Sequence, residues 1–378
     1  MPIAYDPKAF FSVIFQTQDS AIPAVMGRAV IPIPFAILAV GLKLLGQLCE
    51  DPGSLIQPFS LLVGLMLAFR LSDALSKWKM AAQLLLTMHE VARDSMSKAM
   101  VVCHRPGMDE LQTAELLAHL ENFRRLMVLT TVLMMKHVRG DIKHEPHVLA
   151  AELSCGLLRV EEMRMLQDTI VTTAASDPSK GDFFPSRNRV ALGVDLLRQE
   201  MMAMWHAGYF PSAPHYAALE ANITKLSALF EQCEHLGITI VPLLYAQLTR
   251  LLPTVFLLLL PFSVMRGFTW EAIPFCYCIN VVYFALDEAS ASMEAPFGRD
   301  VSDVALEKTL RRIDKLTASQ LGAHFGKPIP NFDIFPGTRS MNLVGGKIIP
   351  TAMSSSTDAH AWVRMQDYES TTSIRSLS

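Results

Sequence analysis

Four runs of mostly apolar residues dominate the pattern along this chain. They cover residues 25–48, 55–69, 237–265 and 272–286. Each approaches the roughly 20 apolar residues that a helix needs to cross a bilayer, but most of the runs contain a polar residue: Arg28, Lys43, Arg250 or Asn280. Such residues fit helices that face each other or a water-filled path. We therefore predict two membrane hairpins in an oligomeric bundle, with a soluble protein of unusually buried helices as the alternative.

The residues between the two pairs of runs are soluble in character. Apolar positions recur at helical spacing over 75–102, 108–138, 190–208 and 215–236. The run Leu126–Met135 is too short to span a bilayer and predicts a buried core helix. Pro, Gly, Ser and charged residues cluster at 103–107 and 176–189, which predicts breaks there. The expected fold class is all-α, with four transmembrane helices per subunit and a cytosolic helical bundle.

An even number of spans places both termini and the middle block on one side of the membrane. Basic residues flank the spans on that side and favour the cytosol: Arg70, Lys77, Lys79 and Arg299. The expected segments are an N-terminal segment 1–24, a hairpin 25–70, a cytosolic domain 71–236, a second hairpin 237–286, an acidic turn with a C-terminal helix 287–350, and a tail 351–378. The tail is rich in Ser and Thr and poor in apolar residues, so we expect it to be disordered.

Composition supports a membrane protein. The chain is 51% hydrophobic and 18% charged, whereas soluble domains carry about 25% charged residues. The net charge of −3 and the lack of a long basic block argue against a nucleic-acid partner. The six cysteines form no C-x-x-C pair and no zinc spacing. The first twenty residues do not resemble a cleaved signal or a transit peptide.

Motifs for catalysis are missing from the sequence. There is no phosphate-binding loop, no dinucleotide fingerprint and no H-E-x-x-H, so we expect neither enzymatic activity nor a catalytic cofactor. Asp287 and Glu288 form a carboxylate pair without a nearby nucleophile or base. The densest group of possible metal ligands is His137, His144, Glu145 and His147. Scattered surface imidazoles are favoured over a metal site there.

Three stretches carry motifs in a fixed order. Residues 57–78 contain Pro58, Phe59, Gly64, Phe69, Arg70, Lys77 and Trp78. Residues 238–262 contain Pro242, Tyr245, Arg250, Pro261 and Phe262. The third stretch, after the last apolar run, contains Asp287, Glu288, Glu294, Pro296, Phe297, Gly298, Asp300 and Asp303. Together they resemble the bestrophin family of ion channels over about residues 5–330, and its bacterial and plastid branch more than its animal branch.

The resemblance implies a homopentamer around one axial pore, whose narrow apolar neck is lined by the second membrane helix. It assigns Gln57, Leu61 and Leu65 to the neck, four residues apart on one helix face. Five copies of an apolar ring can gate an ion path by dewetting. The competing interpretation is that Leu61 and Leu65 pack against a neighbouring helix. His215 is a candidate for a second, cytosolic constriction, where five imidazoles would be pH-sensitive; a surface or helix-start histidine is the alternative.

The resemblance also implies a regulatory Ca²⁺ site in the turn after the fourth membrane helix. It matches Asp300 and Asp303 to the carboxylate ligands, and Ser292, Ala295 and Ala4 to the backbone carbonyl donors. Oxygen ligands of this kind suit Ca²⁺. In the alternative, Asp300 caps the following helix and Asp303 lies in the first turn of that helix.

The implied function is an anion channel that conducts chloride, with bicarbonate as a second candidate ion. The alternatives are a cation-selective bestrophin homologue and a non-conducting membrane scaffold. The expected partners are small anions, membrane lipid and further copies of the chain. The plasma membrane is the expected location, and a plastid (thylakoid) membrane is the alternative.

Overall fold

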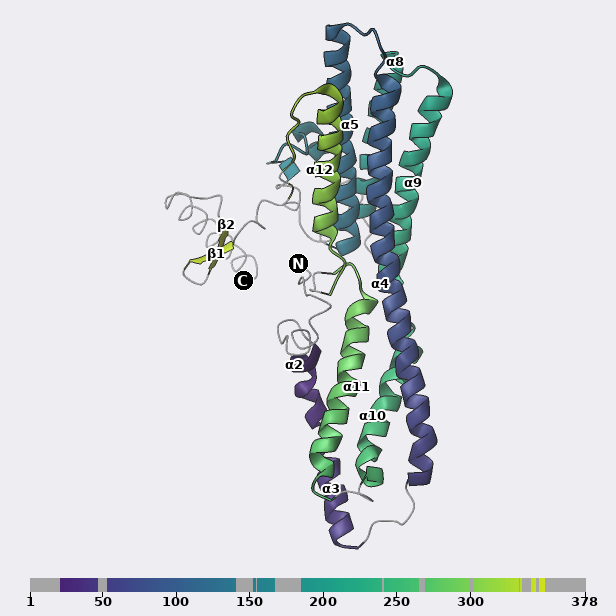
Figure 1. Cartoon of the computed structure of the whole chain (residues 1–378), viewed down its shortest axis with the longest axis vertical. Coiled ribbons are helices and arrows are strands. Elements are labelled where there is room, and N and C mark those ends of the chain that lie inside the picture. The colour runs from purple at the N-terminus through teal and green to yellow at the C-terminus, as the bar shows by residue number, and fades with distance from the viewer. Residues whose placement is uncertain are drawn as a thin grey trace, which may run out of the picture.

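The protein is elongated and almost entirely helical (Figure 1). The computed structural model describes residues 21–46, 53–140, 152–153, 155–166, 185–239, 241–264, 269–298, 302–332, 334, 341–344 and 347–350. Two groups of helices follow one another along the long axis. We call them the apolar end, at the bottom of Figure 1, and the polar end, at the top.

The apolar end contains two long helices, three short segments and the first part of a third long helix. The long helices are α10 (Leu243–Val264), α11 (Ala272–Glu294) and α4 (Gly53–Cys103), which begins here. The short segments are α2 (Ala21–Met26), the 3-10 helix η1 (Arg28–Val30) and α3 (Ile33–Leu44), and all three contact α11. Among the described helices, three are long and apolar enough to cross a membrane: Pro58–Cys103 of α4, α10 and α11.

The first apolar run does not form one spanning helix, and this corrects the expectation for residues 25–48. The run is interrupted after Met26 and again before Ile33. Pro32 and Pro34 explain the second break, because neither has an N–H that could donate a hydrogen bond to the preceding turn. The broken segment still runs beside α11 (Figure 1). A total of four spans therefore stays a prediction.

Helix α4 joins the two ends. It has 51 residues, so at about 1.5 Å per residue it is roughly 75 Å long. Pro58 lies inside this helix, at its sixth residue, and it lacks the N–H that would otherwise donate to the carbonyl of Ser54. The helix continues through residue 70, so the expected boundary between hairpin and cytosolic domain falls inside one rigid element.

The polar end is a bundle around one large hydrophobic core. Besides α4 it contains α5 (Glu110–Arg139), α8 (Pro185–His206), α9 (Ala213–Ile238) and α12 (Leu306–Phe325). A capping box of Asp109 and Gln112 starts α5, and Gly140 ends it in the left-handed conformation that glycine favours. Every residue of Leu126–Met135 is buried, which confirms the predicted core helix.

Two buried arginines of α5 tie this bundle together. Arg124 donates to Asp314 of α12 at 2.6 Å and to the carbonyl of Pro330 at 2.7 Å. Its neighbour Arg125 donates to both oxygens of Glu162, at 2.6 and 2.8 Å. Charges so far from water are expected to be paired, because an unpaired one would lose its hydration without compensation.

One element was not predicted: an antiparallel hairpin of β1 (Met341–Val344) and β2 (Lys347–Pro350). It lies away from the helical bundle, at the left of Figure 1. The predicted disordered tail, 351–378, lies outside the described residues.

Candidate functional site

Helix α4 presents two different faces at the apolar end. Val63, Leu67 and Arg70 are buried toward the rest of the apolar end. On another face, Leu61 is 77% exposed and Leu65 is 51% exposed, and Phe69, one turn further on, is exposed as well. No described helix of the same chain covers the two leucines. The side chain of Gln57 lies outside the described residues.

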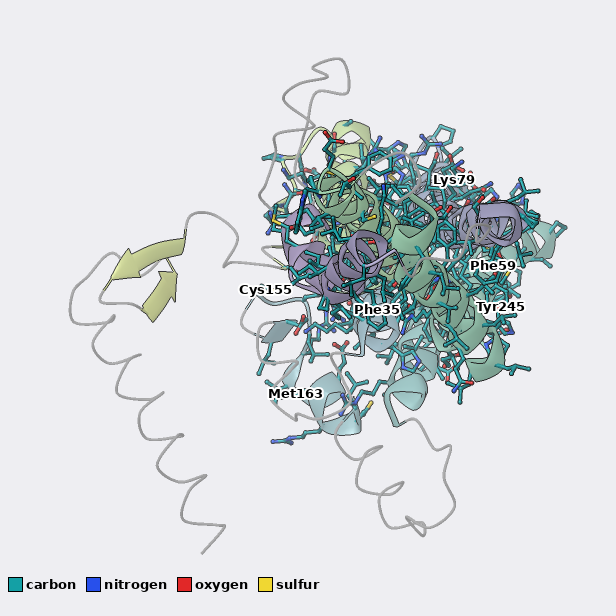
Figure 2. All side chains as sticks on the ribbon, turned by 90° about the horizontal axis from the view of Figure 1, so that it is seen from below. Phe35, Phe59, Lys79, Cys155, Met163 and Tyr245 are labelled. Atoms are coloured by element: carbon teal, nitrogen blue, oxygen red, sulfur yellow. The ribbon has the colours of Figure 1, made fainter. Side chains whose placement is uncertain are left out.

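Figure 2 views the molecule from below, along its long axis, from the apolar end. Phe59 of α4 and Tyr245 of α10 lie on the same side of the bundle, whereas Phe35 of α3 lies nearer the middle. Phe59 packs on Phe256 of α10, with ring centroids 6.3 Å apart. This contact fixes α4 against α10 and leaves the Leu61–Leu65 face directed elsewhere.

The carboxylates that follow the last apolar run bind arginines from other segments. Arg70 of α4 is only 3% exposed and pairs with Asp287, and with Glu294 at 3.2 Å. These two acids are seven residues apart, so they lie on one face of α11. Arg28 of η1 pairs with the next residue, Glu288, at 2.8 Å. The acidic end of α11 therefore fastens both α4 and η1.

These charges lie at one level, which we call the charged layer: Arg28, Arg70, Arg250, Asp287 and Glu288. Each long helix of the apolar end is uncharged from the tip of that end up to this level. The first charged residue is Arg70 on α4, Arg250 on α10 and Asp287 on α11. The uncharged segments beyond them are about 25, 21 and 22 Å long at about 1.5 Å per residue. The hydrocarbon core of a bilayer is about 30 Å thick. The charged layer therefore marks one boundary of a bilayer-sized apolar slab.

A cavity of about 150 Å³ opens at the charged layer between η1, α4, α10 and α11. Its polar lining consists of Arg28, Thr249, Arg250, Thr254, Tyr283 and Asp287. The apolar lining is Leu67, Pro253, Leu257 and Phe284. Both threonine hydroxyls donate to backbone carbonyls of α10, so the arginines are the cationic donors left to face the cavity.

The turn after α11 is held by three contacts. The N–H of Val304 donates to the carbonyl of Pro296 at 3.0 Å, and the indole N–H of Trp78 in α4 donates to the carbonyl of Ser302 at 2.9 Å. Asp303 is 5% exposed and lies against Gly298. A Cβ on Gly298 would stand 2.6 Å from Asp303 Oδ2 and 3.8 Å from the carbonyl oxygen of Ala295. Only glycine leaves room for this carboxylate.

The other predicted calcium ligands are described only in part. Ser292 lies in the last turn of α11, where carbonyls have no N–H partner within the helix. Asp300 and Ala4 lie outside the described residues. The alternative interpretation of Asp303 is wrong, because α12 begins at Leu306 and Asp303 precedes its first turn. The set of ligands stays a prediction.

His215 is exposed in the first turn of α9 and lies 2.7 Å from the hydroxyl of Ser212, measured from Nδ1. That end of α9 is the far end of the bundle from the apolar end (Figure 1). The structure thus shows a histidine at a helix start, and a role at a constriction stays a prediction.

Other candidate chemistry is structural. His137 is buried and lies 2.9 Å from Glu234, whereas His144, Glu145 and His147 lie outside the described residues. Within the described residues, no three His, Cys, Asp or Glu side chains gather as metal ligands would. Burial raises the pKa of the Cys103 and Cys233 thiols to about 12, so both behave as small apolar groups.

A long helix with an uncovered apolar face, fastened by a charged layer to two further apolar helices, is typical of a membrane protein. The sequence matches the family model described as "Bacterial/Fungal Bestrophin protein" over residues 3–318. The chain therefore belongs to the bestrophin family, a family of ion channels and not of enzymes.

Solved structures agree with this fold. A bacterial bestrophin homologue from Klebsiella pneumoniae is 20% identical, with a TM-score of 0.61, and the match covers 79% of this chain and all of that one. Another solved membrane protein is 20% identical, with a TM-score of 0.63, covering 79% of this chain and 98% of the other. At such identities the likeness shows the fold alone.

A relative with a described activity matches a shorter region. It is a voltage-dependent anion channel-forming protein of Mesorhizobium japonicum, 27% identical over 115 residues. The match covers 30% of this chain and 37% of that protein, so the chain matches little more than a third of its relative's length.

Proposed function

We propose that five copies of this chain form an anion channel whose neck is lined by Leu61 and Leu65 of α4, with Gln57 at one end. The observation that supports it is the uncovered Leu61–Leu65 face of a helix whose other face is fixed by Arg70. The family, and the anion channel named among its relatives, support passage of small anions. Chloride is the proposed ion, with bicarbonate as a second candidate.

The proposed gate depends on the stiffness of α4. Rings of leucine exclude water when they are narrow, and a small outward movement admits water and ions together. The far half of the same helix packs on α9 and α12, so a shift in the polar end is transmitted along α4. Arg70 holds α4 to α11 between the neck and the polar end, and acts as the fulcrum.

We also propose that Ca²⁺ regulates the channel at the turn after α11. Asp303 and the carbonyls of Ser292 and Ala295, with Asp300 and Ala4, would hold the ion. Two features of the structure fit a bound Ca²⁺ ion. The carboxylate of Asp303 is buried against Gly298, and the carbonyls in the last turn of α11 have no N–H partner within the helix. Bound Ca²⁺ would supply a fixed positive charge that fastens the turn to the helix end.

Recording in a planar bilayer under asymmetric KCl tests the channel proposal. A reversal potential near the chloride equilibrium potential supports it, whereas the opposite sign indicates the cation-selective alternative, and silence indicates a scaffold. Leu61→Ala and Leu65→Ala should each raise basal current several-fold. The control is Leu111→Ala, because Leu111 is 72% exposed, close to the value for Leu61, but lies in α5 of the polar end. Unchanged current in both neck variants would remove the neck assignment.

Calcium dependence is tested in the same recordings. Chelation should lower the current of the wild type, and Asp303→Asn should reproduce that loss at saturating Ca²⁺. A wild type that ignores chelation would end the calcium proposal and leave the channel proposal standing. We propose the plasma membrane as the location, and membrane fractionation distinguishes it from a thylakoid membrane.

A further inference from the structure

The cavity at the charged layer has an unused cation. Arg250 is the one charged residue in the sequence of α10, and none of the described carboxylates pairs with it. The other two arginines of the charged layer are each paired with carboxylates of α11. A guanidinium in this position can accept an anionic ligand without breaking an existing ion pair.

The lining is divided in a way that matches an amphiphile. Arg28 and Arg250 supply cationic donors, and the hydroxyl of Tyr283 adds a polar group. The carboxylate of Asp287 also lines the cavity, and Arg70 compensates its charge. Leu67, Leu257 and Phe284 supply an apolar wall of the same cavity. A cavity of about 150 Å³ holds a group of about six heavy atoms. A phosphate group has five, and arginine binds its oxygens through two parallel hydrogen bonds.

The level of the cavity decides between a soluble and a lipid-bound phosphate. The uncharged segments of α4, α10 and α11 all lie on one side of the charged layer. In a bilayer the charged layer therefore lies where phospholipid phosphates lie, with acyl chains along the exposed apolar side chains of α10, among them Leu251, Val255 and Leu259.

We propose that the Arg28–Arg250 cavity binds the phosphate of an anionic phospholipid, whose chains follow α10. This lipid is then a structural ligand that fills the space between η1, α4, α10 and α11 beside the fulcrum of α4. The inference rests on membrane insertion and not on conduction, so a failure to bind lipid leaves the channel proposal untouched.

Native mass spectrometry of the full chain in detergent tests this site, with phosphatidylglycerol and phosphatidylcholine as probes. The wild type should retain phosphatidylglycerol more strongly than phosphatidylcholine. Arg250→Gln should weaken phosphatidylglycerol binding about tenfold, because it removes a pair of charge-assisted hydrogen bonds. Arg250→Lys should weaken it less, since it keeps the charge and loses the paired geometry.

The control is Arg93→Gln, which removes an exposed charge from the polar part of α4 and should leave binding unchanged. Circular dichroism and the elution volume in size-exclusion chromatography establish that each variant is folded. If Arg250→Gln does not fold, the proposal is tested by the weaker binding expected of Arg250→Lys and by the preference of the wild type for phosphatidylglycerol. Equal retention of both lipids, or equal loss in Arg93→Gln and Arg250→Gln, would overturn the proposal. Competition by inorganic phosphate or glycerol 3-phosphate at the affinity of the lipid would show a soluble phosphate site instead.

Discussion

Replacing Arg70 tests the energetic role of the charged layer. Arg70→Met keeps most of the side-chain volume but leaves Asp287 and Glu294 without the cation that pairs with both. Removing one partner of a buried pair costs about 3–5 kcal/mol. The two carboxylates are 23% and 27% exposed, so water recovers part of that loss. We therefore expect a loss of unfolding free energy at the lower limit, about 3 kcal/mol.

The assay is denaturant unfolding in detergent, followed by tryptophan fluorescence, with Trp78 two turns along α4 from Arg70. Arg93→Met changes a similar side chain at an exposed position and should stay within about 0.5 kcal/mol of the wild type. Adding Asp287→Asn and Glu294→Gln to Arg70→Met should recover most of the loss, because no buried charge is then unpaired. A loss below about 1 kcal/mol, or no recovery in the triple variant, would refute the reasoning.

Two further predictions concern the turn and the polar end. Gly298→Ala places a Cβ 2.6 Å from the carboxylate of Asp303 and should destabilise the protein by about 1–3 kcal/mol in thermal unfolding. Gly237→Ala, where the nearest atom is 3.8 Å away, should not destabilise it. Burial, and then the charge of Arg312, lower the pKa of His89 below its ordinary 6.5. As the pH falls, the imidazole of His89 is therefore protonated in the unfolded chain before it is protonated in the folded one. The contribution of His89 to the free energy of unfolding is complete above pH 6.5, and below pH 6.5 it falls by up to about 1.4 kcal/mol per pH unit. His89→Leu should remove that part of the slope between pH 7.5 and 5.5; an unchanged slope contradicts it.

Much of the helical fold could be predicted from the sequence. Long periodic segments gave α5, α8 and α9 nearly at their observed ends, because helical spacing persists over many turns. The prediction that the first apolar run forms one helix was wrong, because hydropathy carries no information about the backbone hydrogen bonds that Pro32 and Pro34 interrupt. The continuity of α4 was also missed, because the sequence becomes more polar after residue 70 although the helix continues without a break to Cys103.

The candidate site was less predictable. Leu61 and Leu65 could be chosen because the resemblance to bestrophins assigns them to the neck; their spacing alone fits packing against a neighbouring helix equally well. The partners of Asp287 and Glu294 could not be identified, because Arg70 is 217 and 224 residues away from them in sequence. Their seven-residue separation was a usable signal, since it places two acids on one face. The contact of Asp303 with Gly298 depends on how the turn folds, which residue types alone do not specify.

The mass of the purified, detergent-solubilised protein tests the central claim most directly. The uncovered Leu61–Leu65 face can line a pore only if several copies bring it to a common axis. Native mass spectrometry should give five times the chain mass of 41.9 kDa after detergent is removed. A species with the mass of one chain would contradict the account, because these leucines would then face lipid.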